Sequence, residues 1–150
     1  MNAEFDRCIR ELPKLMEQLR KEPLLPPNDL PSIPSQGIYV FYEDTTPIYV
    51  GRSNNMRRRI KEHCAASSTH HSATFAFKLA KMQEKGAVKR TDNALAQDPA
   101  FANTFAQKRQ TVSKMCVRVI EINDQITQYL FEAYAVLEFG TTEYNDFWTH

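Results

Sequence analysis

Two short apolar runs flank a polar segment in the first half of the chain. The runs cover residues 37–42 and 48–51, and both are rich in aromatic and β-branched side chains. The segment between them, Glu-Asp-Thr-Thr-Pro, is typical of a turn, so the pattern predicts a β-hairpin. Because side chains alternate across a strand, a bulge-free register places Tyr39 and Tyr49 on one face. The other face then carries four residues suited to a core: Ile38, Val40, Ile48 and Val50.

The polar residues after the hairpin predict a helix that begins near Asn55, with Ser53 or Asn54 as its cap. An inward stripe recurs every four residues and consists of Met56, Ile60 and Cys64. Arg59 and His63 are also four residues apart, so they share the face beside that stripe.

Two interpretations of these polar residues stay open on pattern alone. A tyrosine pair on a hairpin, followed by a helix that presents Arg59 and His63, suits a phosphate-binding site. Tyrosines are also common in ordinary strands, and a basic helix is usually a solvated surface. Arg57 and Lys61, on the other flank of the helix, fit either interpretation.

The N-terminal part of the chain predicts an added helical element followed by a linker. Residues 3–22 are amphipathic, and Pro13 should kink the helix or mark the start of a second one. Residues 23–35 contain five prolines and should be extended. The expected stripe of the helix is Phe5, Ile9, Leu12, Leu15, Met16 and Leu19.

The middle of the chain predicts two helices separated by loops. His70 and His71 lie in a polar break, where exposed loop histidines are the default and a DNA contact is the alternative. A helix is expected over 74–85, with Gly86 as its stop, and Phe75, Leu79 and Met82 at helical spacing. Residues 86–97 predict a surface loop, and Asp98-Pro99 predicts the start of a helix that runs to about Val112.

A third strand and a last helix complete the prediction. The alternating segment 114–122 predicts the strand, and Asn123 or Asp124 caps a helix that ends at about Phe139. Its inward stripe should be Ile126, Tyr129, Leu130, Ala133 and Leu137. Two acids, Glu132 and Glu138, lie at opposite borders of that stripe, and periodicity does not choose between them.

Composition adds few constraints. The chain has 150 residues, 42% of them hydrophobic and 25% charged, which suits one globular domain. The net charge of +1 requires any attraction to DNA to come from a local patch. Three scattered cysteines argue against a disulfide framework, and zinc is not expected because paired CxxC or HxxxH spacing is lacking. Without a leader or a long apolar run, a cytoplasmic protein is expected.

Five motif positions in order resemble the GIY-YIG nuclease family. They are GIY at 37–39, YVG at 49–51, Arg59, His63, and a later Glu followed by the pair Tyr144-Asn145. The resemblance covers about residues 36–150 and is least clear over 86–112. This region either selects the DNA target or is a structural insertion. The resemblance implies an α+β fold, a small three-stranded antiparallel sheet flanked by helices, with residues 1–35 as a helical extension. It also selects Glu132, through its spacing to Asn145, as the metal ligand.

The resemblance implies a metal-dependent DNA endonuclease that hydrolyses phosphodiester bonds. Its catalytic residues would be Tyr39, Tyr49, Arg59, His63, Glu132 and Asn145. Glu132 would hold Mg²⁺ or Mn²⁺, with water and phosphate oxygens filling the rest of the metal's coordination. Arg59 offers a forked donor to phosphate, and Tyr39 would activate water with help from Tyr49 if its pKa is lowered. His63 would relay a proton or position a neighbour.

Asn145 would tie the C-terminal loop to the site, and Arg52, Arg57 and Lys61 would bind neighbouring phosphates. The expected partner is DNA, double-stranded or branched, with a homodimer or a partner protein for target recognition and no membrane. The alternative function is a catalytically idle nucleic-acid-binding or interaction module on the same fold.

Overall fold

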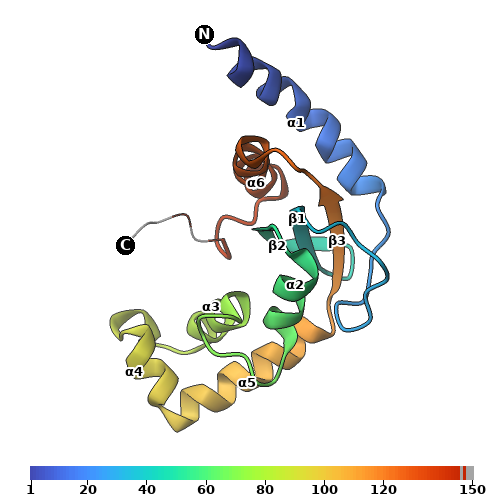
Figure 1. Cartoon of the computed structure of the whole chain (residues 1–150). Coiled ribbons are helices and arrows are strands. Elements are labelled where there is room, and N and C mark those ends of the chain that lie inside the picture. Colours follow the sequence, from blue (N-terminus) through green and yellow to red (C-terminus); the bar gives the residue numbers. More distant parts are fainter. Residues whose placement is uncertain (146, 148–150) are drawn as a thin grey trace.

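A three-stranded antiparallel sheet lies between two groups of helices in the computed structural model, which describes residues 1–145 and 147 (Figure 1). The strands are β1 (Gly37–Glu43), β2 (Thr46–Ser53) and β3 (Cys116–Glu121), in the spatial order β2-β1-β3. The helices are α1 (Ala3–Lys21), α2 (Met56–Cys64), α3 (Thr74–Gln83), the short 3₁₀ helix η1 (Ala87–Lys89), α4 (Asp92–Gln97), α5 (Pro99–Ser113) and α6 (Gln125–Phe139). This architecture confirms the predicted α+β fold and its N-terminal helix.

The central strand β1 is buried on both faces, so the sheet separates two hydrophobic cores. One core contains Tyr39 and Phe41 and is covered by α2, α3 and α5. The other contains Ile38 and Val40 and is covered by α1 and α6. The period-2 alternation of β1 thus assigns its tyrosine face to one set of helices and its aliphatic face to the other.

The hairpin is as predicted, except for an irregularity in its register. Phe41 pairs with Tyr49, but the next residue of β1 pairs with Pro47, so Ile48 has no partner of its own. This bulge turns Ile48 towards the core that contains Tyr39, and its predicted placement on the opposite face is wrong. Tyr39 and Tyr49 remain on the same face because the bulge lies beyond both.

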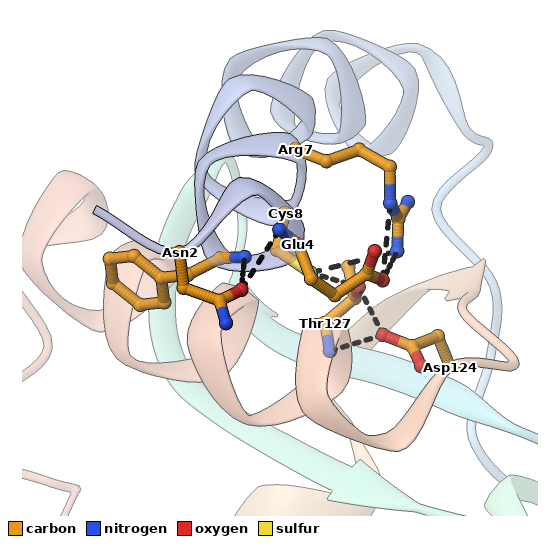
Figure 2. Close-up of polar contacts among 7 residues, drawn as sticks. Asn2, Glu4, Arg7, Cys8, Asp124 and Thr127 are labelled. Atoms are coloured by element: carbon orange, nitrogen blue, oxygen red, sulfur yellow. Dashed lines mark hydrogen bonds and ion pairs between the residues drawn. The ribbon is translucent and has the colours of Figure 1, made fainter.

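Helix α1 is one continuous helix with Pro13 inside it, so Pro13 does not mark the start of a second helix. Asn2 caps it by accepting hydrogen bonds from the backbone N–H groups of Glu4 and Phe5. The first turns lie against the start of α6, where the hydroxyl of Thr127 contacts the sulfur of Cys8 at 3.5 Å (Figure 2). The buried stripe is Cys8, Leu12, Met16 and Leu19, whereas the predicted members Phe5 and Ile9 are exposed.

The proline-rich linker after α1 is extended, as predicted, and contacts the outer edge of β3. Leu25 and Val117 form an isolated antiparallel bridge with both backbone hydrogen bonds at 2.8 Å. The guanidinium of Arg57 donates to the carbonyls of Leu30 and Pro31, which fastens the linker to α2. The linker is therefore held at two points of the domain.

The region around α3 and α4 differs from the prediction in two ways. Helix α3 ends at Gln83 rather than at Lys85, and it buries Phe75, Ala76, Phe77 and Ala80 while Met82 is exposed. Residues 86–97 are not a loop: they form η1 and α4, whose cap is the hydroxyl of Thr91. Helix α5 begins at Pro99 with Asp98 as its cap, as predicted.

Helix α6 has the predicted cap, Asp124, and the predicted end, but the stripe assigned to its inner face is wrong. The buried residues are Thr127, Gln128, Phe131, Ala135 and Val136. The stripe that was expected inside includes Tyr129 and Leu137, which are 56% and 75% exposed. The buried face includes Gln128 because its amide donates to the carbonyl of Ile122, so a polar residue substitutes for an apolar one there.

Across residues 1–145, no helix has the combination of length and apolar character that crossing a membrane requires.

Candidate active site

Tyr39 lies across β2 at a point where only glycine leaves room for its ring. It pairs with Gly51, and a Cβ added to that glycine would lie 2.1 Å from Cζ of the tyrosine. The first glycine of the motif is equally confined, because a Cβ on Gly37 would lie 1.9 Å from the carbonyl oxygen of Ile120. Both glycines are therefore required by close packing, and Gly51 in particular determines where the phenol of Tyr39 lies.

The hydroxyl of Tyr39 is 2.9 Å from Nε2 of His63, and both side chains are fully buried. Burial raises the pKa of Tyr39 well above its ordinary value; Tyr49 and Glu132 add to the rise, and the charge of Arg59 opposes it. Burial also holds the pKa of His63 well below its ordinary value, and Arg59 lowers it further. At neutral pH the pair is therefore a neutral phenol hydrogen-bonded to a neutral imidazole.

Because His63 is buried and neutral, the stability of the fold should fall at acid pH. The unfolded chain protonates this histidine near pH ~6.5 and the folded chain only at lower pH, so each pH unit below that value costs up to about 1.4 kcal/mol. We expect urea unfolding between pH 7.5 and 5 to show this loss in the wild type and a smaller loss in His63→Gln. His71→Gln, at an exposed position, should follow the wild type; equal pH dependence of all three proteins would contradict the buried neutral state.

Arg59 reaches from α2 to the start of α3, where it is held by three groups. Its guanidinium donates to the carbonyl of Ser72, to the hydroxyl of Thr74 at 3.0 Å and to the carboxylate of Glu62 at 3.2 Å. The side chain is 24% exposed, so part of the guanidinium faces solvent. These contacts fix a positive charge beside Tyr39 and leave it accessible to an anion.

Tyr49 lies on the same side of the sheet and stacks on Phe75, with ring centroids 4.5 Å apart and planes 10° apart. Burial raises its pKa, while a hydrogen bond with Thr74 and the charge of Arg59 lower it. Tyr49, Arg59 and Thr74 thus form one polar group beside the ring of His63, whose centroid is 5.4 Å from that of Tyr49.

Glu132 approaches this group from α6. Its charge affects the pKa of both Tyr39 and Tyr49, and burial raises its own pKa while Arg52 lowers it. Nε of Arg52 is 3.5 Å from the carboxylate, and its guanidinium lies over the ring of Tyr129, 3.8 Å from the centroid. Two phenols, a guanidinium and a carboxylate from four separate elements therefore gather in one place. Glu138, the other candidate acid, is exposed.

The carboxylate of Glu132 suits a hard divalent cation bound mainly by water and phosphate. It is 21% exposed, and its ion pair with Arg52 is too poorly aligned to be a hydrogen bond, since Nε of that arginine has no partner among the described residues. The oxygen lone pairs of Glu132 are therefore available to a ligand. Within residues 1–145, no three His, Cys, Asp or Glu side chains form a cluster, so a cation here would take most of its ligands from water and phosphate.

Asn145 attaches the C-terminal segment to the outer edge of β2. Its amide donates to the carbonyl of Val50 at 2.6 Å and accepts from the N–H of the same residue at 3.1 Å. The hydroxyl of Thr141 donates to its oxygen at 2.9 Å. The side chain thus pairs with Val50 as a neighbouring strand would, one residue from Tyr49.

Asn145→Ala should therefore destabilise the fold by about 2–3 kcal/mol, because the buried N–H and carbonyl of Val50 lose their partner. Urea unfolding measures the loss. Asn103→Ala, an exposed residue of α5, should change the stability by less than about 0.5 kcal/mol. A loss below about 1 kcal/mol in Asn145→Ala would show that the amide contributes little to holding this segment.

The three basic residues expected at neighbouring phosphates have different surroundings. Arg52 lies inside the candidate site, against Glu132 and Tyr129, and Arg57 is occupied by the carbonyls of the linker. Lys61 is exposed on α2. Of the three, Lys61 is the one whose charged group is free of a protein contact within the described residues.

Sequence reasoning missed Thr74, Phe75 as a stacking partner, and Thr141. Thr74 and Phe75 lie in the first turn of α3, within a stretch where the only signal was helical spacing. Thr141 follows the predicted end of α6 and contacts Asn145. Its position four residues before Asn145 was the sequence signal that could have indicated this contact.

Comparison with known proteins shows which family the chain resembles. A family model described as the GIY-YIG catalytic domain matches residues 35–145. A 40-residue segment is 42% identical to UvrABC system protein C of Deinococcus radiodurans, and this segment is 26% of the present chain and 6% of that protein. No solved structure matches significantly.

The matching family model places the domain in the class of GIY-YIG nuclease domains. The chain belongs to the GIY-YIG catalytic domain family. It aligns with only a small part of its curated relative, so the similarity concerns the domain rather than the whole of that protein.

Proposed function

We propose that the protein is a divalent-metal-dependent endonuclease that hydrolyses phosphodiester bonds in DNA. The observation that carries the proposal is the convergence of Tyr39, Tyr49, Arg59 and Glu132 from separate elements, with His63 hydrogen-bonded behind Tyr39. Hydrolysis of a phosphodiester needs a deprotonated water, positive charge at the phosphate and stabilisation of the leaving oxygen. The gathered side chains directly offer a way to deprotonate water and a positive charge at the phosphate.

Tyr39 activates water through its neighbour. Its raised pKa means that it is a neutral phenol at rest, so it can take a proton from water only as it gives up its own. Nε2 of His63, 2.9 Å from the phenol oxygen, can accept that proton because the imidazole is neutral. In this proposal the proton is relayed from Tyr39 to His63, so Tyr39 needs no lowered pKa.

Arg59 binds the scissile phosphate. Its fixed guanidinium matches two non-bridging oxygens and stabilises the charge that develops on them in the transition state. Tyr49, beside Arg59, positions the same phosphate or the attacking water.

Glu132 would hold Mg²⁺ or Mn²⁺, and the cation would supply Lewis-acid stabilisation of the phosphate and the leaving oxygen. Arg52 makes no hydrogen bond to the carboxylate, so it can turn towards a phosphate while it still stacks on Tyr129. Arg52 would then contact both the active site and the DNA backbone.

A supercoiled plasmid tests the proposal. With Mg²⁺ or Mn²⁺ at low salt, the wild type should produce nicked or linear DNA, and EDTA should stop the reaction. Higher salt should weaken binding steeply, because phosphate contacts release counterions. Absence of cleavage on plasmid, branched and damaged duplexes with either metal would contradict the proposal.

A catalytically idle nucleic-acid-binding module is the second candidate. The Arg52–Glu132 ion pair favours it, because the arginine already neutralises the carboxylate expected to hold the cation. This candidate predicts DNA binding at low salt that is unaffected by Mg²⁺ and is followed by no cleavage.

A further inference from the structure

A pocket of about 450 Å³ is lined by residues of the loop 65–73 and of the helices α4 and α5. These elements lie beside α3 (Figure 1). The lining of the pocket includes His70, His71, Asn93, Gln97, Phe105 and Arg109. None of these residues belongs to the candidate active site. We propose that this pocket binds a single nucleotide, with the phosphate at Arg109 and the base against the aromatic and amide side chains.

The guanidinium of Arg109 is fixed in position and has no counter-ion among the described residues. Its guanidinium lies over the ring of Phe105, 4.3 Å from the centroid, and Nη1 donates to the carbonyl of Ser68 at 2.9 Å. Its Nε is buried with no hydrogen-bond partner, and no carboxylate of the described residues pairs with it. Partial burial also lowers its pKa. An unpaired, partly buried cation is stabilised by an anion, and a guanidinium suits phosphate.

Other residues of the lining suit a flat heterocycle. Asn93 and Gln97 are four residues apart, so they share one face of α4, and neither amide makes a hydrogen bond with the described residues. Side-chain amides both donate and accept, as the edge of a base requires. The rings of His70 and His71 are 3.9 Å apart, and Nε2 of His70 is buried without a partner in the same part of the chain. Aromatic rings of this kind stack on bases.

The size of the pocket favours a nucleotide over a bare anion. A volume of this order suits an organic ligand, for which pockets of roughly 300–1,000 Å³ are usual, and far exceeds the need of phosphate alone. The loop 65–73 also links the two sites, because Thr69, His70 and His71 line the pocket while Ser72 accepts a hydrogen bond from Arg59. A nucleotide displaced from a DNA strand would thus be held beside the cleavage site. This last step rests on the proposed function.

Nuclear magnetic resonance of the ¹⁵N-labelled protein tests the inference without metal or cleavage. The probes are the four deoxynucleoside 5′-monophosphates, deoxyribose 5-phosphate and inorganic phosphate. We expect the mononucleotides to shift amide signals of residues 69–71, 93–97 and 105–109, with an affinity at least tenfold above that of phosphate. Equal affinity for phosphate, or shifts confined to Tyr39, Tyr49 and Arg59, would overturn the assignment.

Two double variants test whether the side-chain amides of α4 contact the base. Asn93→Ala/Gln97→Ala should weaken mononucleotide binding at least fivefold, while Asn103→Ala/Gln107→Ala, which removes the same groups from exposed positions of α5, should bind as the wild type does. All four residues are exposed, so the fold is preserved in both variants. Equal affinity of the two variants would overturn the inference.

Two DNA duplexes show the source of the nucleotide. In the Glu132→Gln background, a duplex with one unpaired nucleotide should bind at least fivefold more tightly than the same duplex with an abasic residue there, and Asn93→Ala/Gln97→Ala should remove that preference. If mononucleotides bind but the two duplexes bind equally well, the ligand of the pocket is a free nucleotide rather than one from a DNA strand. A wild type that binds mononucleotides but never cleaves DNA would refute the nuclease and retain the pocket.

Discussion

Glu132→Gln is expected to lower metal-dependent plasmid cleavage by about 1,000-fold or more. The substitution keeps the size and position of the side chain, so Tyr39, Arg59 and His63 stay in place. It removes the carboxylate that we assign to the cation, while DNA binding at low salt should change little. Initial rates of nicking, measured with Mg²⁺ and with Mn²⁺, give the effect.

Glu138→Gln is the matched control, because the same acid is removed six residues further along α6 at an exposed position. It should cleave as the wild type does. If Glu132→Gln kept more than about a tenth of the wild-type rate, the metal would be held elsewhere. Thermal unfolding of both variants shows whether a lost rate reflects lost folding, since the substitution also removes the counter-ion of Arg52.

Gly51→Ala should have the second large effect, on both folding and cleavage. The new methyl group would overlap the ring of Tyr39, since the added carbon would lie 2.1–2.5 Å from three of its atoms. That ring is fully buried and its hydroxyl is held by His63, so the strands must separate or the ring must move. We expect the free energy of unfolding to fall by about 1–3 kcal/mol. We also expect the cleavage rate to fall as far as it does in Tyr39→Phe, because both substitutions take the phenol hydroxyl away from its place beside His63.

A double-mutant cycle separates the overlap from other effects of a methyl group in β2. In the Tyr39→Val background, which has no ring at this place, Gly51→Ala should cost at least about 1 kcal/mol less in urea unfolding than it does in the wild type. Additive losses would show that the confined tyrosine is not the reason for glycine at this position.

The strands and most helix starts could be predicted because their signals are local. The hairpin follows from two β-branched runs around a turn, and Asp98 and Asp124 cap helices because their side chains accept backbone N–H groups. The errors have tertiary causes. The inner face of α6 includes Gln128, whose hydrogen bond to Ile122 is invisible to a hydrophobicity pattern. Likewise, the bulge at Ile48 depends on how two strands pair.

The residues that gather at the candidate site could be named from the sequence, but their electrostatics could not. Spacing paired Tyr39 with Tyr49 on one face of the hairpin and Arg59 with His63 on one face of a helix. The family resemblance joined the two pairs and added Glu132. Their protonation states depend on burial, which the sequence does not reveal: His63 is neutral because it is enclosed, and Tyr39 is a phenol for the same reason. The position of Arg52 against Glu132 likewise results from the packing of α6 on β2.

Both outer edges of the small sheet carry a contact from an end of the chain. Leu25 pairs with β3 on one side, and the amide of Asn145 pairs with β2 on the other. Growth of the sheet by a strand from a second molecule would first have to displace one of these segments. Self-association should therefore use helical surfaces, and a truncation that removes either segment should convert the protein into one that aggregates through its strands.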